Sequence, residues 1–302
     1  MPSTDAGRRA VPRAAILLIA AITVLWGLNW PAMKMAVSEL SPWTFRAACV
    51  VISGTGLMAI AWFSGERLRL PRAYWRSFLV VASCSVTGWN LLSAFSLKHM
   101  AGGRGAIIAY TMPVWAAIFS ALWLGERLEP RRILALVLGM IGIGFAIGPD
   151  LVGLSRDLLG PLFMILAAIC WAAGTVAIKT RAWPIGMMAH TAWQLVIGGM
   201  PIVLAWLVIE PRPDLGHLTW RGILATLYAA IVGLIFCFAA FNKVVTLLPA
   251  TAAAISILAI PIVGVLGSAW LLGEPAGWRE LVALVLVLGA MSLVLIPRRL
   301  TK

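Results

Sequence analysis

Charged residues are scarce in this chain of 302 residues. Only 12% of the residues are Asp, Glu, Lys or Arg, whereas 62% are hydrophobic, and the mean hydropathy is +0.97. Soluble domains carry roughly 25% charged residues and about 45–50% apolar ones. The chain therefore has too few charges to cover a globular surface in water, and a lipid bilayer is the better solvent for it.

The sequence also lacks the motifs of enzymes and metal sites. It contains no HExxH, no GxSxG with a partner histidine and no pair of aspartates deep in an apolar run. The cysteines lie inside apolar runs, with no second ligand at metal-binding spacing, so we expect buried structural thiols. These gaps argue against an intramembrane enzyme, and no metal or cofactor is expected. The four cysteines are Cys49, Cys84, Cys170 and Cys237.

The net charge of +13 does not indicate a nucleic-acid partner, because the basic residues form no continuous face. They occur in short loops, as in membrane proteins that face an anionic cytoplasmic leaflet. If the N-terminus is cytoplasmic, 16 of the 24 Lys and Arg residues fall on that side and 8 on the other. We therefore expect a multi-pass protein of the bacterial inner membrane, with both termini cytoplasmic and the lipid bilayer as its surroundings.

Ten apolar segments are long enough to be read as membrane-spanning helices, which need about 20 mainly apolar residues. Short loops between them predict a compact bundle of antiparallel neighbours. The fold class is therefore an all-α integral membrane protein. The expected spans cover residues 14–37, 42–63, 76–98, 103–124, 131–148, 159–179, 187–208, 219–243, 249–272 and 279–297.

Two stretches half a chain apart resemble each other. In Trp26–Lys34 and in Trp171–Lys179 a tryptophan leads, a lysine follows eight positions later, and small or polar residues lie between. The offset between the two copies is 145 residues. Both copies lie in membrane-length apolar runs, which indicates an internal duplication.

Further markers repeat in the same order at an offset of 148. Pro113 in the fourth span matches Pro261 in the ninth, and residues 124–126 (Leu-Gly-Glu) match residues 272–274. Each proline lies near the centre of its span, where it removes a backbone hydrogen bond and bends the helix. Such a bend could leave carbonyl groups free for a solute, although kinks of this kind are also tolerated in packed membrane helices.

An odd number of spans in each copy reverses the second copy in the membrane. The prediction is ten transmembrane helices arranged as two inverted five-helix repeats, an architecture typical of alternating-access transporters with a midplane site. The predicted domains are a cytoplasmic N-terminal tail (1–13), a first repeat (14–148), a connecting loop (149–158), a second repeat (159–297) and a cytoplasmic C-terminal tail (298–302).

These motifs resemble a known family. The start Trp26-Gly27-Leu28-Asn29 with its trailing Lys34, the proline-centred fourth and ninth spans and the repeated Leu-Gly-Glu are similar to the EamA-type branch of the drug/metabolite transporter superfamily. The resemblance implies a ten-helix transporter with a central cavity lined by spans 1, 3, 4, 6, 8 and 9. It also implies that spans 5 and 10 lie at the periphery, where a homodimer could form. In size and style the chain is most similar to the YddG-type aromatic amino acid exporters.

Polar and aromatic residues at depth are the candidates for a substrate site, because polar groups in hydrocarbon usually face the bundle interior. Asn29 lies three residues from Trp26, on the same helical face. Indole and phenol rings would suit an aromatic or apolar solute, by stacking and by cation–π contact with an ammonium group. The alternatives are hydrogen bonds that staple helices and simple core packing. The substrate-binding candidates are Trp26, Asn29, Trp89, Asn90, Tyr110, Trp115, Trp171 and Thr175.

Lys34 and Lys179 end their spans at opposite faces of the membrane. They either snorkel to the headgroups or attract a carboxylate-bearing solute at the two mouths. Arg46, one turn into the second span, is expected to snorkel as well. Glu126 and Glu274 are expected to be structural, through ion pairs with the nearby Arg131 and Arg279.

The preferred function is export of amino acids, with aromatic or apolar side chains favoured, or of similar small metabolites. The alternative is a nucleoside, vitamin or drug-like solute on the same scaffold. A proton relay needs a titratable group at depth, and no Asp or Glu lies in the middle of a predicted span. We therefore expect uniport or exchange, by alternating access, with a small-molecule substrate as the partner.

Overall fold

The computed structural model describes residues 13–125, 130–151, 158–247 and 259–295, and every element in these ranges is helical. Seven of the helices are long and apolar enough to cross a membrane, and the shorter Ile260–Leu272 is apolar as well. The seven are Ile16–Glu39, Pro42–Phe63, Arg72–His99, Gly102–Leu124, Leu159–Lys179, Met187–Ile209 and Trp220–Phe241. An all-α membrane protein is thereby confirmed, while ten spans in two repeats stays a prediction.

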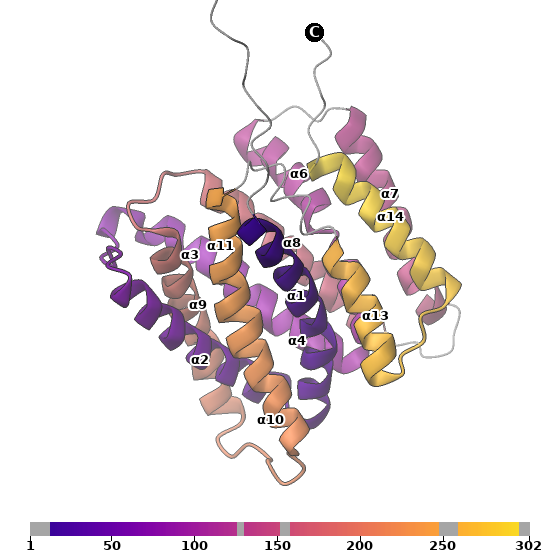
Figure 1. Cartoon of the computed structure of the whole chain (residues 1–302), viewed down its shortest axis with the longest axis horizontal. Helices are drawn as coiled ribbons and strands as arrows, with labels where there is room; N and C mark the ends of the chain where they lie inside the picture. Colours follow the sequence, from indigo (N-terminus) through magenta and orange to yellow (C-terminus); the bar gives the residue numbers. More distant parts are fainter. Residues whose placement is uncertain (1–12, 126–129, 152–157, 248–258, 296–302) are drawn as a thin grey trace, which may run out of the picture.

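The elements lie side by side in one bundle (Figure 1). They are α1 (Arg13–Glu39), α2 (Pro42–Phe63), η1 (Arg72–Tyr74), α3 (Trp75–Ala82), η2 (Ser83–Gly88), α4 (Trp89–His99), α5 (Gly102–Ala109), α6 (Met112–Leu124), α7 (Pro130–Leu151), α8 (Leu159–Lys179), α9 (Met187–Ile209), α10 (Trp220–Leu227), η3 (Tyr228–Phe236), α11 (Cys237–Leu247), α13 (Ile260–Leu272) and α14 (Trp278–Leu295).

Two of the long helices contain a π-helical stretch at matching places. In the first half of the chain (13–151), η2 joins α3 to α4, and in the second half (158–295), η3 joins α10 to α11. η2 ends at Gly88, and η3 contains Gly233, which lies 145 residues further along the chain. A π-helical turn changes the phase of a helix and is frequent at functional sites. The match was not anticipated from the sequence.

The fourth predicted span is broken in the middle. α5 ends at Ala109, Tyr110 and Thr111 form a turn, and α6 starts at Met112 with Pro113 in its first turn. A proline is accommodated there because the first helical N–H groups have no partner within the helix. Pro261 holds the same place at the start of α13, whereas the preceding part of that predicted span, 249–258, lies outside the described residues.

The repeated Leu-Gly-Glu motif ends a helix in both halves. Gly125 follows α6 with φ of 67°, and Gly273 follows α13 with φ of 64°. This left-handed conformation suits glycine because glycine has no Cβ. The repeated glycine is therefore explained by helix termination.

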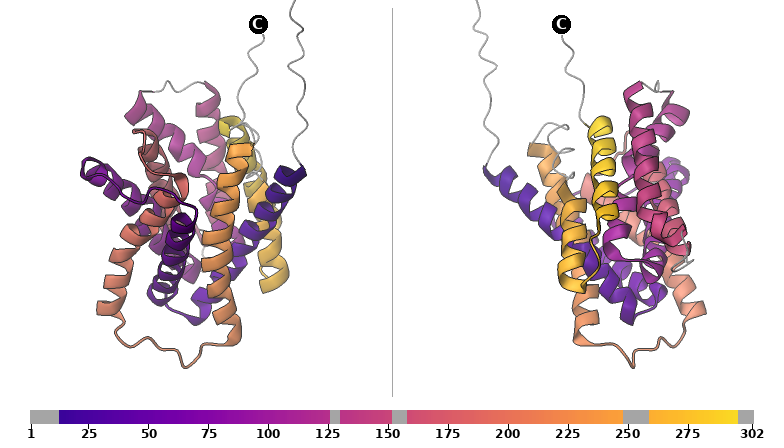
Figure 2. Two further views of the ribbon diagram at one scale, coloured as in Figure 1. Left: turned by 60° about the vertical axis from the view of Figure 1, so that its left-hand side comes forward. Right: turned by 90° about the vertical axis from the view of Figure 1, so that its right-hand side faces the viewer.

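Helices from the first half pack mainly on helices from the second half. α1 packs on α13, α2 on α9, α4 on α8, and α7 on α14. Figures 1 and 2 show this exchange, with α13 beside α1 and α14 beside α7. Small residues allow the close approach, as in other membrane bundles: Gly27 of α1 lies against Val263, and Gly264 lies against Trp30.

Four carboxylates bind helix N-termini in the opposite half of the chain. Glu274 accepts hydrogen bonds from the backbone N–H groups of Gly102 and Gly103 at the start of α5, at 2.8 and 3.0 Å. An anion is favoured there by the unpaired N–H groups and by the helix dipole. The predicted pair of Glu274 with Arg279 is wrong, since Arg279 lies over the Trp278 ring, and Glu126 lies outside the described residues.

The other three caps follow the same rule. Glu39 of α1 accepts from Thr219 N–H, 2.7 Å away, just before α10. Glu210, at the end of α9, binds the hydroxyls of Ser41 and Thr44 at the start of α2. Glu66, after α2, accepts from Ala189 N–H in the first turn of α9 at 2.8 Å. Each cap thus connects the two halves of the chain.

α1 begins and α14 ends at the same end of the bundle (Figure 1). This agrees with the expected placement of the two ends on one side, but it does not reveal which side is cytoplasmic. The predicted tails, apart from residue 13, and most of the connecting loop 149–158 lie outside the described residues.

We predict that Glu274→Gln lowers the apparent midpoint of thermal unfolding in detergent by about 2–5 °C, because the helix N-terminus loses its anionic cap. Intrinsic fluorescence during a temperature ramp measures the midpoint. Asp214→Asn is the matched control, since Asp214 is exposed in a loop and its replacement removes the same charge. Equal midpoints for the two variants would contradict the role of the cap.

Candidate functional site

Seven aromatic rings form a continuous series through the centre of the bundle, here named the aromatic chain. Each ring lies within ring-contact distance of the next. Trp89 is 5.2 Å from Trp171 between ring centroids, and Trp30 is 6.4 Å from both Trp89 and Tyr110. Centroid separations of about 4.5–7 Å with inclined planes are favourable for aromatic pairs. The members are Trp26, Trp30, Trp89, Tyr110, Trp171, Phe238 and Phe241.

The aromatic chain joins both halves of the molecule. Trp171 of α8 contacts Trp89 of α4 and also Phe238 of α11, 6.2 Å away. Trp26 of α1 closes the other end, at 5.3 Å from Phe238 and 5.9 Å from Phe241. A change in the relative position of the two halves must therefore rearrange these rings.

Local backbone structure explains why the rings meet. Trp26 and Trp30 are four residues apart on α1 and so share one face of that helix. Trp89 is the first residue after the π-helical η2, and Phe238 is the second residue after the π-helical η3. Tyr110 lies in the turn between α5 and α6. Helix irregularities thus place three of the seven rings.

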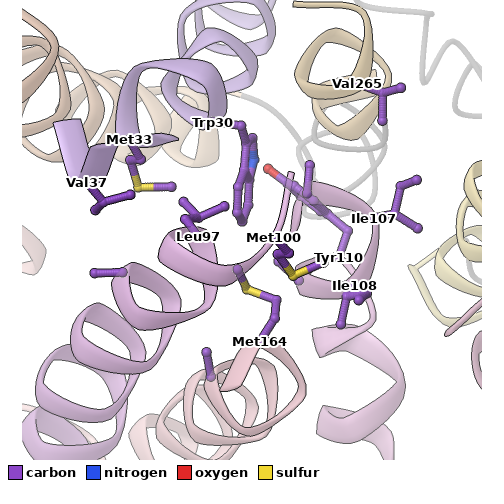
Figure 3. Packing of buried hydrophobic residues seen from close by; sticks show 14 of the residues in the cluster. Trp30, Met33, Val37, Leu97, Met100, Ile107, Ile108, Tyr110, Met164 and Val265 are labelled. Atoms are coloured by element: carbon purple, nitrogen blue, oxygen red, sulfur yellow. The ribbon is translucent and has the colours of Figure 1, made fainter. Parts of the chain in front are cut away.

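One end of the aromatic chain is enclosed by apolar side chains. Tyr110 is 8% exposed and Trp30 4% exposed, and Figure 3 shows the Tyr110 ring directed toward Trp30 among sulfur and aliphatic groups. Water is therefore excluded from this end. The neighbours drawn there include Met33, Leu97, Met100, Ile108 and Met164.

Two amide side chains on α1 and α4 have an acceptor oxygen without a hydrogen-bond partner. Asn90 is 2% exposed and donates from Nδ2 to the Val86 carbonyl of its own helix at 2.9 Å, but its Oδ1 is buried without a partner. Asn29 Oδ1 is also buried without a partner, next to Gly233 of η3. For these two residues, the hydrogen bonds described in the structure therefore do not include the expected one between helices. An unpartnered buried amide oxygen is costly, so each of these oxygens is a candidate to accept a hydrogen bond from a water molecule or a ligand.

Arg46 is buried, at 2% exposure, and does not snorkel as expected. Its Nη2 donates to Ser93 Oγ of α4 at 2.8 Å and lies 3.2 Å from Met33 Sδ of α1. Its Nε is buried without a partner. The expectation failed because α1 and α4 pack over this part of α2, so the side chain cannot reach the headgroups.

The two lysines that were predicted to be equivalent, Lys34 and Lys179, differ in their surroundings. Lys34 is half-buried and donates from Nζ to the Leu97 carbonyl at the end of α4, at 2.7 Å. Lys98 donates in return to the Val37 carbonyl of α1 at 3.2 Å. Lys179 is exposed at the end of α8. Lys34 therefore ties α1 to α4, and the two lysines are not equivalent in this structure.

Two remaining substrate-binding candidates have contacts within their own helices. Trp115 donates from Nε1 to Thr111 Oγ1 at 3.2 Å, and Thr175 donates to the Trp171 carbonyl at 2.8 Å. Pro113 starts α6 directly after the Tyr110 turn, so its contribution is to the backbone at one end of the aromatic chain. Their roles in binding stay predictions.

The structure brings several residues to this region that were not predicted as site residues from the sequence. Trp30 follows Trp26 by four residues and could have been placed on the same face. Phe238 and Phe241 carried no signal, because η3 shifts the phase of the span in which they lie. Arg46 was visible as a charge inside an apolar run, but helix packing alone decided its burial.

Comparison with known families now identifies the fold and its activity. The model of the EamA-like transporter family matches residues 13–148 and matches a second time at residues 158–296. The chain belongs to the EamA-like transporter family. It is a multi-pass membrane transporter, and the predicted resemblance to the EamA-type branch is confirmed.

Relatives of this EamA-family protein extend over nearly the whole chain. The transporter YvbV of Bacillus subtilis is 27% identical, over 92% of this chain and 90% of its own length. The transporter YoaV of the same organism is 21% identical, over 91% and 92%. The protein PecM of Dickeya dadantii is 27% identical, over 89% and 88%. All three are similar to this chain over most of its length, and the first two are named as transporters.

A solved crystal structure supports the fold. It matches with a TM-score of 0.65 at 19% sequence identity, over 92% of this chain and 95% of the other. At this identity the match supports the arrangement of helices alone. Within the described residues no group of three or more His, Cys, Asp or Glu could hold a metal ion.

The close approach of η3 to α1 gives a test of the Asn29 position. A methyl group on Gly233 would lie 2.7 Å from Asn29 Oδ1 and 3.0 Å from its Cγ. We predict that Gly233→Ala lowers the apparent unfolding midpoint by several degrees, because overpacking of this kind typically destabilises by about 1–3 kcal/mol. Thermal unfolding in detergent measures the effect.

Gly144→Ala serves as the matched control for the Gly233 variant. No atom lies within 4 Å of a methyl group at position 144, and alanine favours a helix over glycine. Its midpoint is expected to stay equal or to rise. An unfolding midpoint of Gly233→Ala equal to that of the wild type would show that the space between Gly233 and Asn29 accommodates a methyl group.

Proposed function

We propose that this EamA-family protein exports amino acids with aromatic or apolar side chains, or similar small metabolites, across the bacterial inner membrane. The aromatic chain is the observation that carries the proposal. Flat aromatic faces bind an aromatic side chain by stacking, and they attract an ammonium group by cation–π interaction. Export is the direction that the resemblance to the YddG-type exporters implies, and the relative YedA of Escherichia coli is named an inner membrane transporter.

We further propose that the ten predicted spans form two inverted five-helix repeats that work by alternating access. The two matches of the family model, at residues 13–148 and 158–296, support a duplication. The matched π-helical stretches and the matched prolines support it independently. In inverted-repeat transporters the site lies near mid-bilayer at the repeat interface. The contact of Trp171 in the second half of the chain with Trp89 in the first half supports such a site here.

Transport would proceed without a proton, as uniport or exchange. Among the described acidic residues, Glu39, Glu66, Glu210 and Glu274 are engaged in hydrogen bonds at helix N-termini. A carboxylate at depth is the usual proton carrier in transporters. The solute gradient itself would then drive the flux.

We predict that purified protein in liposomes catalyses counterflow of radiolabelled phenylalanine, and that Trp171→Ala raises the half-saturation concentration about 10-fold. A tenfold change corresponds to about 1.4 kcal/mol, the scale of one aromatic contact. Trp270→Ala is the matched control, since Trp270 is 81% exposed on α13 and should leave the half-saturation value unchanged.

A different outcome of the same screen would redirect the proposal. If phenylalanine, tryptophan and leucine fail to exchange while a nucleoside or a vitamin does, the scaffold serves the alternative solute class. If Trp171→Ala and Trp270→Ala behave alike, the aromatic chain is a packing feature and not the site.

The absence of proton coupling is tested by a second measurement. Liposomes that contain a trapped pH-sensitive dye are mixed rapidly with a phenylalanine gradient, and the lumenal pH is followed. We expect no protein-dependent pH change while labelled phenylalanine crosses. A solute-driven proton flux would refute uniport and exchange.

A further inference from the structure

We propose that Arg46 binds the carboxylate group of the transported solute, and that the free amide oxygens of Asn29 and Asn90 accept hydrogen bonds from its ammonium group. The inference rests on the proposed amino acid transport and specifies its ligand chemistry. It makes the zwitterionic α-amino acid head group, and not the side chain alone, a determinant of selectivity.

Arg46 buries a positive charge without an anionic partner in the described part of the chain. The Arg46 guanidinium contacts the Ser93 hydroxyl and the Met33 thioether, and it lies beside the Cys49 thiol, so none of these neighbours is a carboxylate. Its Nε has no hydrogen-bond partner. The Phe45 ring lies 4.7 Å from the guanidinium carbon. A buried arginine without an anionic partner is strongly unfavourable, in a membrane above all.

The described part of the chain offers no carboxylate to Arg46. Four glutamates are engaged at helix N-termini, namely Glu39, Glu66, Glu210 and Glu274. Asp214 accepts a hydrogen bond from Gly216 N–H in an exposed loop. Glu280 lies in the first turn of α14, beside Gly277. An anion from outside the protein is therefore the natural partner of this guanidinium. Planar guanidinium matches a carboxylate with two parallel hydrogen bonds.

Arg46 also lies close to the aromatic chain, because it contacts α1 and α4, the helices that carry Trp30 and Trp89. Met33 lies three residues after Trp30 on α1, and Ser93 lies four residues after Trp89 on α4. Residues three or four apart share a helix face. The two residues that hold the guanidinium thus lie about one helical turn along α1 and α4 from Trp30 and Trp89. We infer that one amino acid can span from the guanidinium to these rings.

The amide oxygens of Asn29 and Asn90 are available to accept hydrogen bonds from an ammonium group. Asn90 lies between Trp89 and Ser93 on α4, and Ser93 Oγ donates to the Asn90 carbonyl, 3.2 Å away. Asn29 is the residue before Trp30 on α1. Both amide oxygens are buried without a partner, and an ammonium group supplies three donors. Cation, acceptors and rings together match the carboxylate, ammonium and side chain of one solute.

The test compares three probes in counterflow competition against labelled phenylalanine: phenylalanine itself, phenethylamine, which lacks the carboxylate, and 3-phenylpropionate, which lacks the ammonium. For the wild type we expect each analogue to compete about 10- to 100-fold more weakly than phenylalanine, the range for losing hydrogen bonds to a charged group. Equal competition by phenethylamine would overturn the role of Arg46 without any variant.

The variants separate recognition from structure. In Arg46→Gln we expect the half-saturation value for phenylalanine to rise about 10- to 100-fold, while competition by phenethylamine changes less than about 3-fold. Arg46→Lys keeps the charge but not the planar fork, so an intermediate loss for phenylalanine is expected. Arg221→Gln removes an exposed arginine beside Trp220 and is the matched control. A purely structural role would reduce both probes equally.

The outcomes also distinguish this inference from the proposed function. If the wild type moves phenylalanine but Arg46→Gln keeps the same preference for the carboxylate, the inference is refuted and amino acid transport stands. If the wild type does not move phenylalanine, the carboxylate site is tested directly by measuring the binding of 3-phenylpropionate to the purified wild type and to Arg46→Gln. Binding that Arg46→Gln abolishes supports a carboxylate site, and absence of binding overturns it.

Discussion

Inside the hydrocarbon of a membrane a polar group has no water to bind, and this constraint organises the whole chain. Glutamates from one half satisfy the helix N-termini of the other half, and Lys34 and Lys98 donate to carbonyl groups at the ends of each other's helices. In the described part of the chain five buried side-chain atoms have no partner, and three of them belong to Asn29, Asn90 and Arg46. Asn29 and Asn90 lie on α1 and α4, which carry rings of the aromatic chain, and Arg46 of α2 contacts both of these helices. Where the rule of complete pairing is broken, a solute that brings its own charges would complete it.

The caps also bear on how the molecule could move. Glu39, Glu210 and Glu274 bind at the starts of α10, α2 and α5, whereas Glu66 binds at the start of α9, which runs antiparallel to α10. The first three caps therefore lie at one end of the bundle and the fourth at the other. Since each cap joins the two halves, a rocking motion would open caps at one end while those at the other remain. The π-helical stretches η2 and η3 lie between these ends, next to the rings of the aromatic chain.

Much of the candidate site could be predicted because periodicity and repetition are readable in the chain. Trp26, Trp89, Tyr110 and Trp171 were chosen as deep aromatic residues, and the structure brings their rings into one series. The paired prolines indicated irregular helices, and α5 indeed ends before Pro113. Phe238 was missed, because a π-helical turn changes the facing of every later residue and leaves no mark in composition. Arg46 was misjudged, because a charge near a helix start reaches the headgroups only if no neighbouring helix covers it.

The amino-acid sequence by itself determined the membrane environment and the helical class, because these depend on composition and on spacing along the chain. It also determined where helices stop, as the left-handed Gly125 and Gly273 illustrate. Only the tertiary structure decided which side chains meet. Glu274 reached α5 and not Arg279, Lys34 bound a carbonyl of α4, and Arg46 was enclosed between α1 and α4. Contacts between segments far apart in sequence arise from helix packing, and that packing turned Trp26 and its repeat Trp171 into parts of one aromatic chain.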